Sequence, residues 1–178
     1  RRIDSVGMPL RDVHVKIINQ DKKEAAENEN GLIHVKTPSI YLGYVCGNSK
    51  FETFEPGWLN TGDIGYFDKF GELHIVGRAD DVIIIHAHKI YPSEIERVIL
   101  ECSAVKECAV AKVEINGNDC IGCLYAGDKE ISGEINGQLK NRLLPYEIPR
   151  FFMRCDKLPR TKNGKIIVAE VRDILKKK

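Results

Sequence analysis

The 178-residue sequence has few of the features that mark membrane, secreted or nucleic-acid-binding proteins. Its longest β-branched apolar run, residues 82–85, is far shorter than the roughly 20 residues that cross a bilayer. No secretory signal pattern opens it, and we expect residue 1 to lie inside a longer protein. The 27 basic and 26 acidic side chains leave a net charge of +1, without the basic excess typical of nucleic-acid binding. We therefore expect no membrane span and no nucleic-acid partner.

Motifs for metals and for phosphate loops are missing too. Cys120 and Cys123 have metal-like spacing, but no second cysteine or histidine pair accompanies them, and positions three apart on a strand face opposite sides. We interpret the six cysteines as free thiols of a reducing cytoplasm and expect no metal ligand within this chain. The spacing of a glycine-rich phosphate-binding loop is also absent.

Short strands dominate the first part of the chain. Residues 13–17 alternate apolar and polar side chains, residues 32–35 form a second predicted strand, and residues 73–76 form a third. Residues 68–71 end in glycine and are typical of a hairpin turn. Strands this short and this closely spaced favour a small barrel or sandwich.

The pattern changes near Asp80, where helices begin to alternate with strands. Pro92 opens a helix for which Ser93 and Glu96 are a predicted capping box. The next expected elements are strands at residues 105–115 and 121–126, a helix from residue 132, a strand at residues 151–153 and a final helix near residues 168–175. The predicted fold class is therefore α+β, with a boundary between residues 1–79 and residues 80–178.

Two segments of the first part carry side chains suited to nucleotide oxygens. Gly62 lets the backbone turn tightly and present the carboxylate of Asp63, which can accept two hydrogen bonds from a vicinal diol such as a ribose. Arg78 offers a planar fork of donors for phosphate or ribose oxygens. Each has a plainer alternative: a Gly-Asp turn that only caps a strand, and a surface arginine paired with Asp80 or Asp81.

A third segment, residues 158–166, is a loop bracketed by proline and glycine. Lys165 follows the flexible Gly164, and a lysine on a mobile loop can carry a point charge onto a phosphate. The plainer alternative is one more exposed lysine. Between residues 150 and 178, ten basic side chains outnumber three acidic ones. This local excess fits either a polyphosphate ligand or a solvated helix face.

In this order and at this spacing, the segments resemble the late core motifs of the adenylate-forming superfamily, which contains acyl-CoA synthetases, adenylation domains of peptide synthetases and luciferases. The resemblance covers essentially the whole chain, through residues 6–10, 31–35, 41–44, 58–63, 77–96 and 158–166. It implies that residues 1–79 are the β-rich end of a large N-terminal domain. Residues 80–178 would then be the small mobile C-terminal domain, with its hinge at Asp80.

The resemblance also implies a role for individual residues. Asp63 matches the aspartate that holds the ribose hydroxyls of ATP, and Arg78 matches an arginine that contacts ribose or phosphate. Lys89, where the family often has arginine, belongs to the expected nucleotide-binding set. Lys165 matches the catalytic lysine that bridges the substrate carboxylate and the α-phosphate during adenylation.

Ala87 and His88 match the segment that lines the path of the pantetheine thiol, but the family usually has glycine where this chain has Ala87. A methyl group there can narrow the path, unless the tunnel is wider elsewhere or the thiol enters along a shifted path. A poor thioester-forming enzyme is the third alternative. We favour a shifted path, because His86 and His88 also depart from the small residues common in this segment.

The function that the resemblance implies is that of an acid–thiol ligase. The intact protein would use ATP to convert a carboxylic acid into acyl-AMP and then transfer the acyl group to CoA. The phosphate loop, the magnesium ligand and the acid-binding pocket would lie upstream of residue 1, so the isolated chain is expected to be inactive. The alternatives are a peptide-synthetase or carrier-protein domain, which acylates protein-bound phosphopantetheine, and a non-enzymatic binding module on this fold. The segment at residues 90–96 resembles that of acyl- or aryl-CoA ligases more than that of peptide-synthetase domains.

Overall fold

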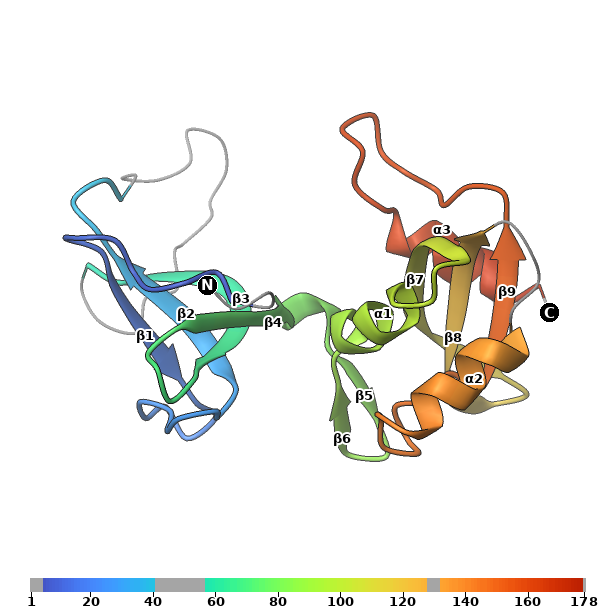
Figure 1. Ribbon diagram of the computed structural model, residues 1–178, viewed down its shortest axis with the longest axis horizontal. Coiled ribbons are helices and arrows are strands. Elements are labelled where there is room, and N and C mark those ends of the chain that lie inside the picture. Colours follow the sequence, from blue (N-terminus) through green and yellow to red (C-terminus); the bar gives the residue numbers. More distant parts are fainter. Residues whose placement is uncertain (1–4, 41–56, 128–131, 178) are drawn as a thin grey trace. The chain divides into compact units, whose positions relative to one another are not determined.

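The computed structural model describes residues 5–40, 57–127 and 132–177, and it confirms the predicted α+β class (Figure 1). The chain divides into two compact units, Arg1–Asp80 and Asp81–Lys178. The division lies one residue beyond the boundary expected from the sequence. Within the described ranges, no helix is long and apolar enough to cross a membrane.

The first unit is built on a four-stranded antiparallel sheet in the order β1-β2-β3-β4. The strands are β1 (His14–Ile18), β2 (Gly31–Lys36), β3 (Leu59–Phe67) and β4 (Leu73–Arg78). Residues 5–7 run along the start of β4, where Gly7 and Leu73 form an antiparallel bridge. Apolar side chains, among them Ile17, Ile33 and Val76, are buried in this unit.

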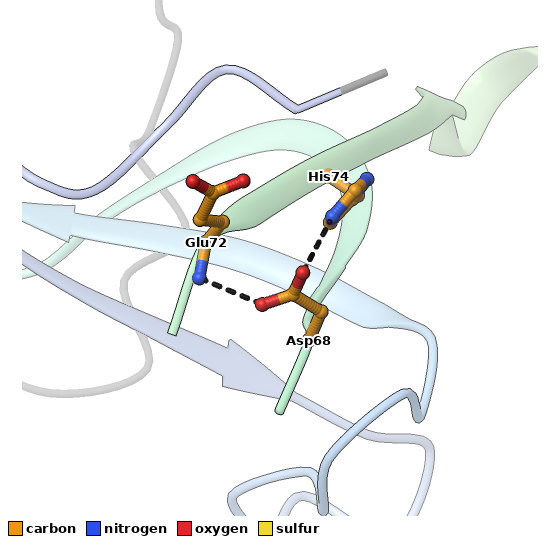
Figure 2. Close-up of side chains that lie close together, drawn as sticks. All are labelled: Asp68, Glu72 and His74. Carbon is orange, nitrogen blue, oxygen red and sulfur yellow. Dashed lines mark hydrogen bonds and ion pairs between the residues drawn. The ribbon is translucent and has the colours of Figure 1, made fainter. Parts of the chain in front are cut away.

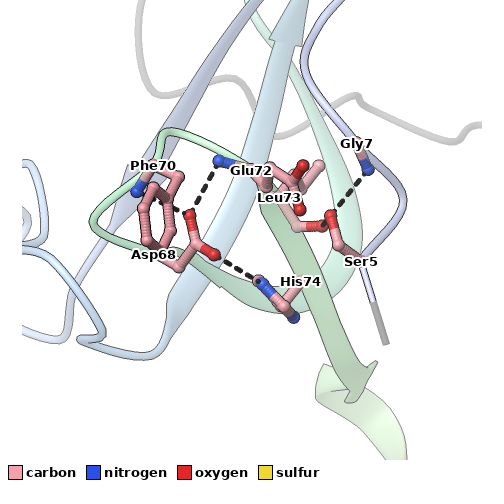
Figure 3. A network of polar contacts seen from close by, with 7 residues as sticks. All are labelled: Ser5, Gly7, Asp68, Phe70, Glu72, Leu73 and His74. Carbon is pink, nitrogen blue, oxygen red and sulfur yellow. Dashed lines mark hydrogen bonds and ion pairs between the residues drawn. The ribbon is translucent and has the colours of Figure 1, made fainter. Parts of the chain in front are cut away.

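The turn between β3 and β4 confirms the hairpin predicted at residues 68–71. One Asp68 carboxylate oxygen accepts hydrogen bonds from the amides of Phe70 (2.9 Å) and Glu72 (3.0 Å). Gly71 has a φ of +73°, a conformation that glycine adopts at little cost. Figure 3 shows the first residues of β4, with this turn on one side and the Ser5–Gly7 segment on the other.

The second unit begins with one turn of 3-10 helix, η1 (Ala79–Asp81, which spans the boundary between the units), and a two-stranded hairpin of β5 (Ile83–Ile85) and β6 (His88–Ile90). Its three-stranded sheet has the order β7-β8-β9, formed by β7 (Val105–Ile115), β8 (Asn118–Gly127) and β9 (Phe151–Cys155). Strands β7 and β8 are antiparallel, and β8 and β9 are parallel. The helices are α1 (Pro92–Leu100), α2 (Ser132–Lys140) and α3 (Val168–Leu175).

Both faces of this sheet are covered. Ile95 of α1 and Ile135 of α2 belong to one buried cluster, whereas Val171 of α3 belongs to a second. Covering on both faces explains why β8 is buried along most of its length rather than alternating. Cys120 and Cys123 lie in different clusters, as expected for opposite faces, and the described cysteines are all free thiols.

The predicted capping box at the start of α1 is wrong. Tyr91 is the N-cap residue, and its side chain makes no capping hydrogen bond. The helix already begins at Pro92, whose fixed φ and missing N–H suit the first helical position. Ser93 therefore lies inside the helix. The carboxylate of Glu96 instead accepts the backbone N–H of Val110 (2.8 Å) on the edge strand β7. Burial raises the pKa of Glu96, as does Asp81, while the Val110 amide opposes the shift.

Candidate functional site

Two residues predicted to bind nucleotide lie side by side in the first unit. Asp63 of β3 and Arg78 of β4 are direct partners in the strand register. Arg78 Nη1 lies 3.0 Å from Asp63 Oδ1 and donates a second hydrogen bond to the carbonyl of Thr61 (3.1 Å). The alternative pairing of Arg78 with Asp80 or Asp81 is therefore wrong. In the described part of the chain the second Asp63 oxygen accepts no hydrogen bond, so it can accept one from a hydroxyl.

The segment before Asp63 is organised to present it. Gly62 has a φ of +74°, and a Cβ atom added there would lie 3.0 Å from Arg78 Nη2. The side chain of Asn60 accepts the Gly62 amide (2.9 Å), and that of Thr61 accepts the Asp63 amide (3.0 Å). The predicted turn is wrong, because Gly62 lies within β3, where its positive φ marks a local irregularity in the pairing with β2. The missing Cβ atom leaves room for the guanidinium of Arg78.

Lys165 lies in the second unit, on the long connection between β9 and α3 (Figure 1). Its side chain is exposed. The backbone around it forms a closed loop, in which Thr161 N–H donates to the Lys165 carbonyl (2.8 Å) and Gly164 N–H donates to the Thr161 carbonyl (2.9 Å). Gly164 has a φ of +83°. The loop therefore has a defined shape, with the predicted catalytic ammonium at its surface.

The three predicted residues 87–89 lie in the hairpin of β5 and β6, all with exposed side chains. His86 and Ala87 form its two-residue turn, with φ of +49° and +66°. Positive φ at both central positions is the requirement of a type I′ turn, which favours Asn-Gly. His88 stacks on Tyr146, with ring centroids 4.1 Å apart and an interplanar angle of 11°. The preference for glycine at position 87 thus has a backbone cause as well as the expected tunnel cause.

Asp80, the predicted hinge, lies in η1 and is exposed. It is the last residue of the first compact unit. Its side chain makes no hydrogen bond or ion pair to any other described residue. The role of Asp80 as a pivot stays a prediction. The segment at residues 41–44, which contributed to the family resemblance, lies outside the described residues.

A cluster that the sequence reasoning did not single out lies at the β3–β4 turn (Figure 2). Ligand-type atoms of Asp68, Glu72 and His74 all lie within 4.8 Å of one another, a set that in chemical terms could hold a cation. Both Asp68 oxygens are already engaged, one by two turn amides and the other by His74 Nε2 at 3.3 Å.

The hydrogen bonds of the cluster stabilise the β3–β4 turn, and this structural role explains why the three residues lie together. His74 also stacks on Tyr66, with ring centroids 4.8 Å apart. Burial raises the pKa of Asp68, but hydrogen bonds from the Glu72 and Phe70 amides and from His74 outweigh it, so the pKa is lowered overall. We assign no metal to these residues. The spacing of the acidic residues around a predicted hairpin turn was the sequence signal that could have revealed the cluster.

Arg160 and Glu107 were also missed. Arg160 belongs to the 158–166 segment but received no role, and its guanidinium forms an ion pair with Glu107 of β7. These two residues are 53 positions apart, so no local pattern links them. Strand pairing and loop packing bring them together beside the loop that carries Lys165.

Comparison with known proteins extends these observations. Residues 94–165 match the family model described as the AMP-binding enzyme C-terminal domain. The chain is 35% identical, over 178 residues, to the 2-succinylbenzoate–CoA ligase of Bacillus subtilis, covering 98% of this chain and 36% of that protein. It is 32% identical, over 173 residues, to the long-chain-fatty-acid–CoA ligase of Salmonella typhimurium, covering 95% and 31%.

A solved structure is similar as well. The O-succinylbenzoate coenzyme A synthetase of Bacillus subtilis, in complex with ATP and a magnesium ion, matches with a TM-score of 0.87 and 34% identity. The match covers 97% of this chain and 36% of that one. The chain thus spans about a third of the length of the relatives it matches.

Proposed function

Since the chain carries the C-terminal domain of the AMP-binding, adenylate-forming ligases, we propose that the protein containing it activates a carboxylic acid with ATP and transfers the acyl group to CoA. The observation that carries this proposal is the combination of a held Asp63–Arg78 pair with an exposed Lys165 on a closed loop. The Asp63–Arg78 pair suits the sugar and phosphate groups of a nucleotide. The lysine suits a centre at which negative charge develops.

The chemistry follows from the charges of the reactants. A free carboxylate offers no good leaving group, whereas an acyl-AMP releases AMP when a thiol attacks. In our proposal the second carboxylate oxygen of Asp63 accepts a hydrogen bond from a ribose hydroxyl. Arg78 donates to the other oxygen and directs its remaining N–H groups to ribose or phosphate. Lys165 lies against the carboxylate and the α-phosphate, where it stabilises the charge that grows as pyrophosphate departs.

Magnesium and CoA enter the proposal through the relatives, one of which was solved with ATP and a magnesium ion. In the described part of this chain the one cluster suited to a cation, at Asp68, is committed to its turn, so we propose no magnesium ligand among the described residues. Residues 87–89 would line the path of the CoA thiol, with Lys89 close to the nucleotide.

CoA is the acceptor that the observations favour over a carrier protein. The two curated relatives reported above, which match along nearly the whole chain, are named as CoA ligases. The acid is a different matter, because one of these relatives is named for succinylbenzoate and another for long-chain fatty acids, at nearly equal identity. We infer that this chain carries the nucleotide and thiol chemistry, and that residues outside it select the acid.

The test uses a full-length protein that contains this chain, a panel of aromatic and aliphatic acids, and ATP–pyrophosphate exchange as the readout. We expect exchange that depends on one class of acid, followed by CoA thioester formation. Lys165→Ala should lower the exchange rate at least about a hundredfold, because it removes a charge used as pyrophosphate leaves. The same variant should form thioester normally from acyl-AMP supplied ready-made.

Lys162→Ala is the matched control, because Lys162 is another exposed lysine of the same loop. We expect it to retain exchange within about twofold, as is usual for a surface substitution. Equal losses in both half-reactions for Lys165→Ala would mean that this lysine has only a structural role. Absence of any acid-dependent exchange in the unmodified protein would refute the proposed function itself.

A further inference from the structure

Hydrophobic packing holds the loop that carries Lys165 mainly at its base. Leu158, at the start of the loop, is buried in the cluster that also contains Val171 of α3. Residues 161–165 are exposed, and a Cβ atom added at Gly164 would meet nothing within 4 Å. Packing therefore contributes little at the tip. Hydrogen bonds must define the position of the Lys165 backbone.

Arg160 supplies a contact next to Lys165. Its Nη1 donates a hydrogen bond to the carbonyl oxygen of Gly164 (2.6 Å), which belongs to the peptide bond leading into Lys165. Residues Arg160 and Ile166 also form an antiparallel bridge across the loop. The other guanidinium nitrogen, Nη2, forms an ion pair with Glu107. One planar side chain thus ties the tip of the loop to a residue outside it.

Glu107 fixes this tie to the sheet. It lies on β7 at a register shift between Val105 and Glu107, on the strand most extensively paired with β8. Its second carboxylate oxygen accepts the backbone N–H of Leu158 (3.1 Å). One carboxylate therefore holds both Leu158, the first residue of the loop, and Arg160, whose guanidinium binds the Gly164 carbonyl at the tip. Its side chain is 24% exposed, so solvent screens the pair less than a fully exposed one.

We propose that Glu107 and Arg160 are positioning residues that hold the Gly164–Lys165 peptide, and with it the Lys165 ammonium, for the adenylation step. The inference rests on the function proposed above for Lys165. It goes beyond that function because neither residue is given any contact with substrate. A lysine side chain is long and flexible, and a displacement of about 1 Å at a reacting group can cost about a hundredfold in rate. Fixing its backbone removes a large part of this uncertainty.

The two contacts of Arg160 need an arginine. Its two nitrogens reach acceptors on different segments, the Gly164 carbonyl and the Glu107 carboxylate. Lysine has the same charge but carries a single nitrogen on a flexible stem, so it cannot present a planar fork to both. Arg160→Lys therefore tests geometry with charge preserved. Glu107→Gln tests the charge of the other partner with nearly the same shape.

The activity test separates the half-reactions in a full-length protein that contains this chain. We expect Arg160→Lys and Glu107→Gln each to lower the maximal rate of acid-dependent pyrophosphate exchange at least about tenfold, as a misplaced catalytic group would. The KM for ATP should change little. Thioester formation from supplied acyl-AMP should stay within about twofold. The double variant should be no slower than the slower single one, because both changes break one connection.

A matched control is present in the same unit. Arg142 also pairs with a glutamate, Glu101, and the two side chains are 45% and 51% exposed. Neither side chain forms a hydrogen bond or ion pair with the described 158–166 loop. Arg142→Lys should leave both half-reactions within about twofold. A loss in Arg142→Lys equal to that in Arg160→Lys would overturn the proposal, because any weakened ion pair would then have the same effect.

A second measurement does not depend on activity. In the 178-residue chain, amide hydrogen exchange and heteronuclear NOE values of Gly164 and Lys165 report the order of the loop. We expect both positions to become more mobile in Arg160→Lys and Glu107→Gln, while amides of β7 and β8 stay as protected as in the unmodified chain. Unchanged order at Gly164 and Lys165 would overturn the positioning role.

The outcomes separate this inference from the proposed function. If Lys165→Ala abolishes exchange while both positioning variants stay within about twofold, the function stands and this inference fails. If the positioning variants lower both half-reactions equally, their role is general stability and the inference fails again. If Lys165→Ala leaves exchange intact, the proposed role of Lys165 fails and the positioning role fails with it.

Discussion

At the scale of single residues, Ala87 stands where the backbone favours glycine. The described residues include two hairpins with two-residue turns of positive φ: His86-Ala87 at +49° and +66°, and Asn116-Gly117 at +52° and +75°. The second is the Asn-Gly combination that such turns prefer. The first has alanine instead of glycine at its second position, which puts a β-carbon in the left-handed region at a cost of roughly 1–2 kcal/mol for an ordinary residue.

Ala87→Gly should therefore stabilise the second unit. Glycine relieves the strain at position 87 but adds freedom to the unfolded chain, so we expect a net gain of about 0.5–1 kcal/mol in the free energy of unfolding. Urea unfolding of the 178-residue chain, followed by circular dichroism, measures it. Gly117→Ala is the mirrored control, because a Cβ atom there would meet nothing within 4 Å and only backbone strain remains. It should destabilise by a similar amount, and a destabilising Ala87→Gly would contradict the strain argument.

The same variant bears on thioester formation. Because the backbone alone accounts for a preference for glycine at this turn, the methyl group of Ala87 need not obstruct a thiol tunnel. In the full-length protein we expect Ala87→Gly to change the thioester step by less than about tenfold, an energy near 1.4 kcal/mol. A far larger gain would show that the methyl group does narrow the path.

At the scale of elements, the anchoring of the 158–166 loop should depend on pH. The hydrogen bond from Arg160 lowers the pKa of Glu107, helped by the Leu158 amide, while partial burial opposes the shift. A lowered pKa in the folded state means that the contribution is fully present above the ordinary glutamate value of about 4.3. It is lost as the pH falls through the lower, folded value.

The Leu158 amide reports this titration directly, because it donates to the Glu107 carboxylate. Its NMR chemical shift should follow a titration whose midpoint lies below about pH 4.3. In Glu107→Gln the transition should disappear, and in Arg160→Gln it should move to higher pH. A midpoint at or above 4.3 in the unmodified chain would show that the ion pair does not favour ionised Glu107.

At the scale of the whole molecule, Asp80 is the expected pivot between two compact units. Hinges are a few positions that absorb backbone rotation. Asp80→Pro fixes φ at that position, and we expect it to impair one half-reaction of the full-length protein more than the other. Asp80→Ala changes the side chain without fixing φ, so it should affect both half-reactions much less. If Asp80→Pro changes the rates of both half-reactions by the same factor, Asp80 is not a hinge.

Local sequence by itself determined a large part of the fold. The predicted strand at residues 105–115 has the observed bounds of β7, and the turn at residues 68–71 forms where glycine and short polar residues predict it. The change to alternating helices and strands near residue 80 was visible as a change of period. The order and spacing of the motifs also indicated the family, because that information lies along the chain and needs no contacts.

Tertiary structure decided the contacts between distant residues. Asp63 meets Arg78 because β3 and β4 pair in one register, and Glu107 meets Arg160 because β7 packs beside the loop after β9. Glu96 does not cap the helix start, which begins at Pro92 without a side-chain cap. Its carboxylate instead accepts the Val110 N–H, which the edge strand β7 presents. A periodic pattern tells which face of an element is buried, but which polar groups meet depends on register and packing, and these are set only when the elements assemble.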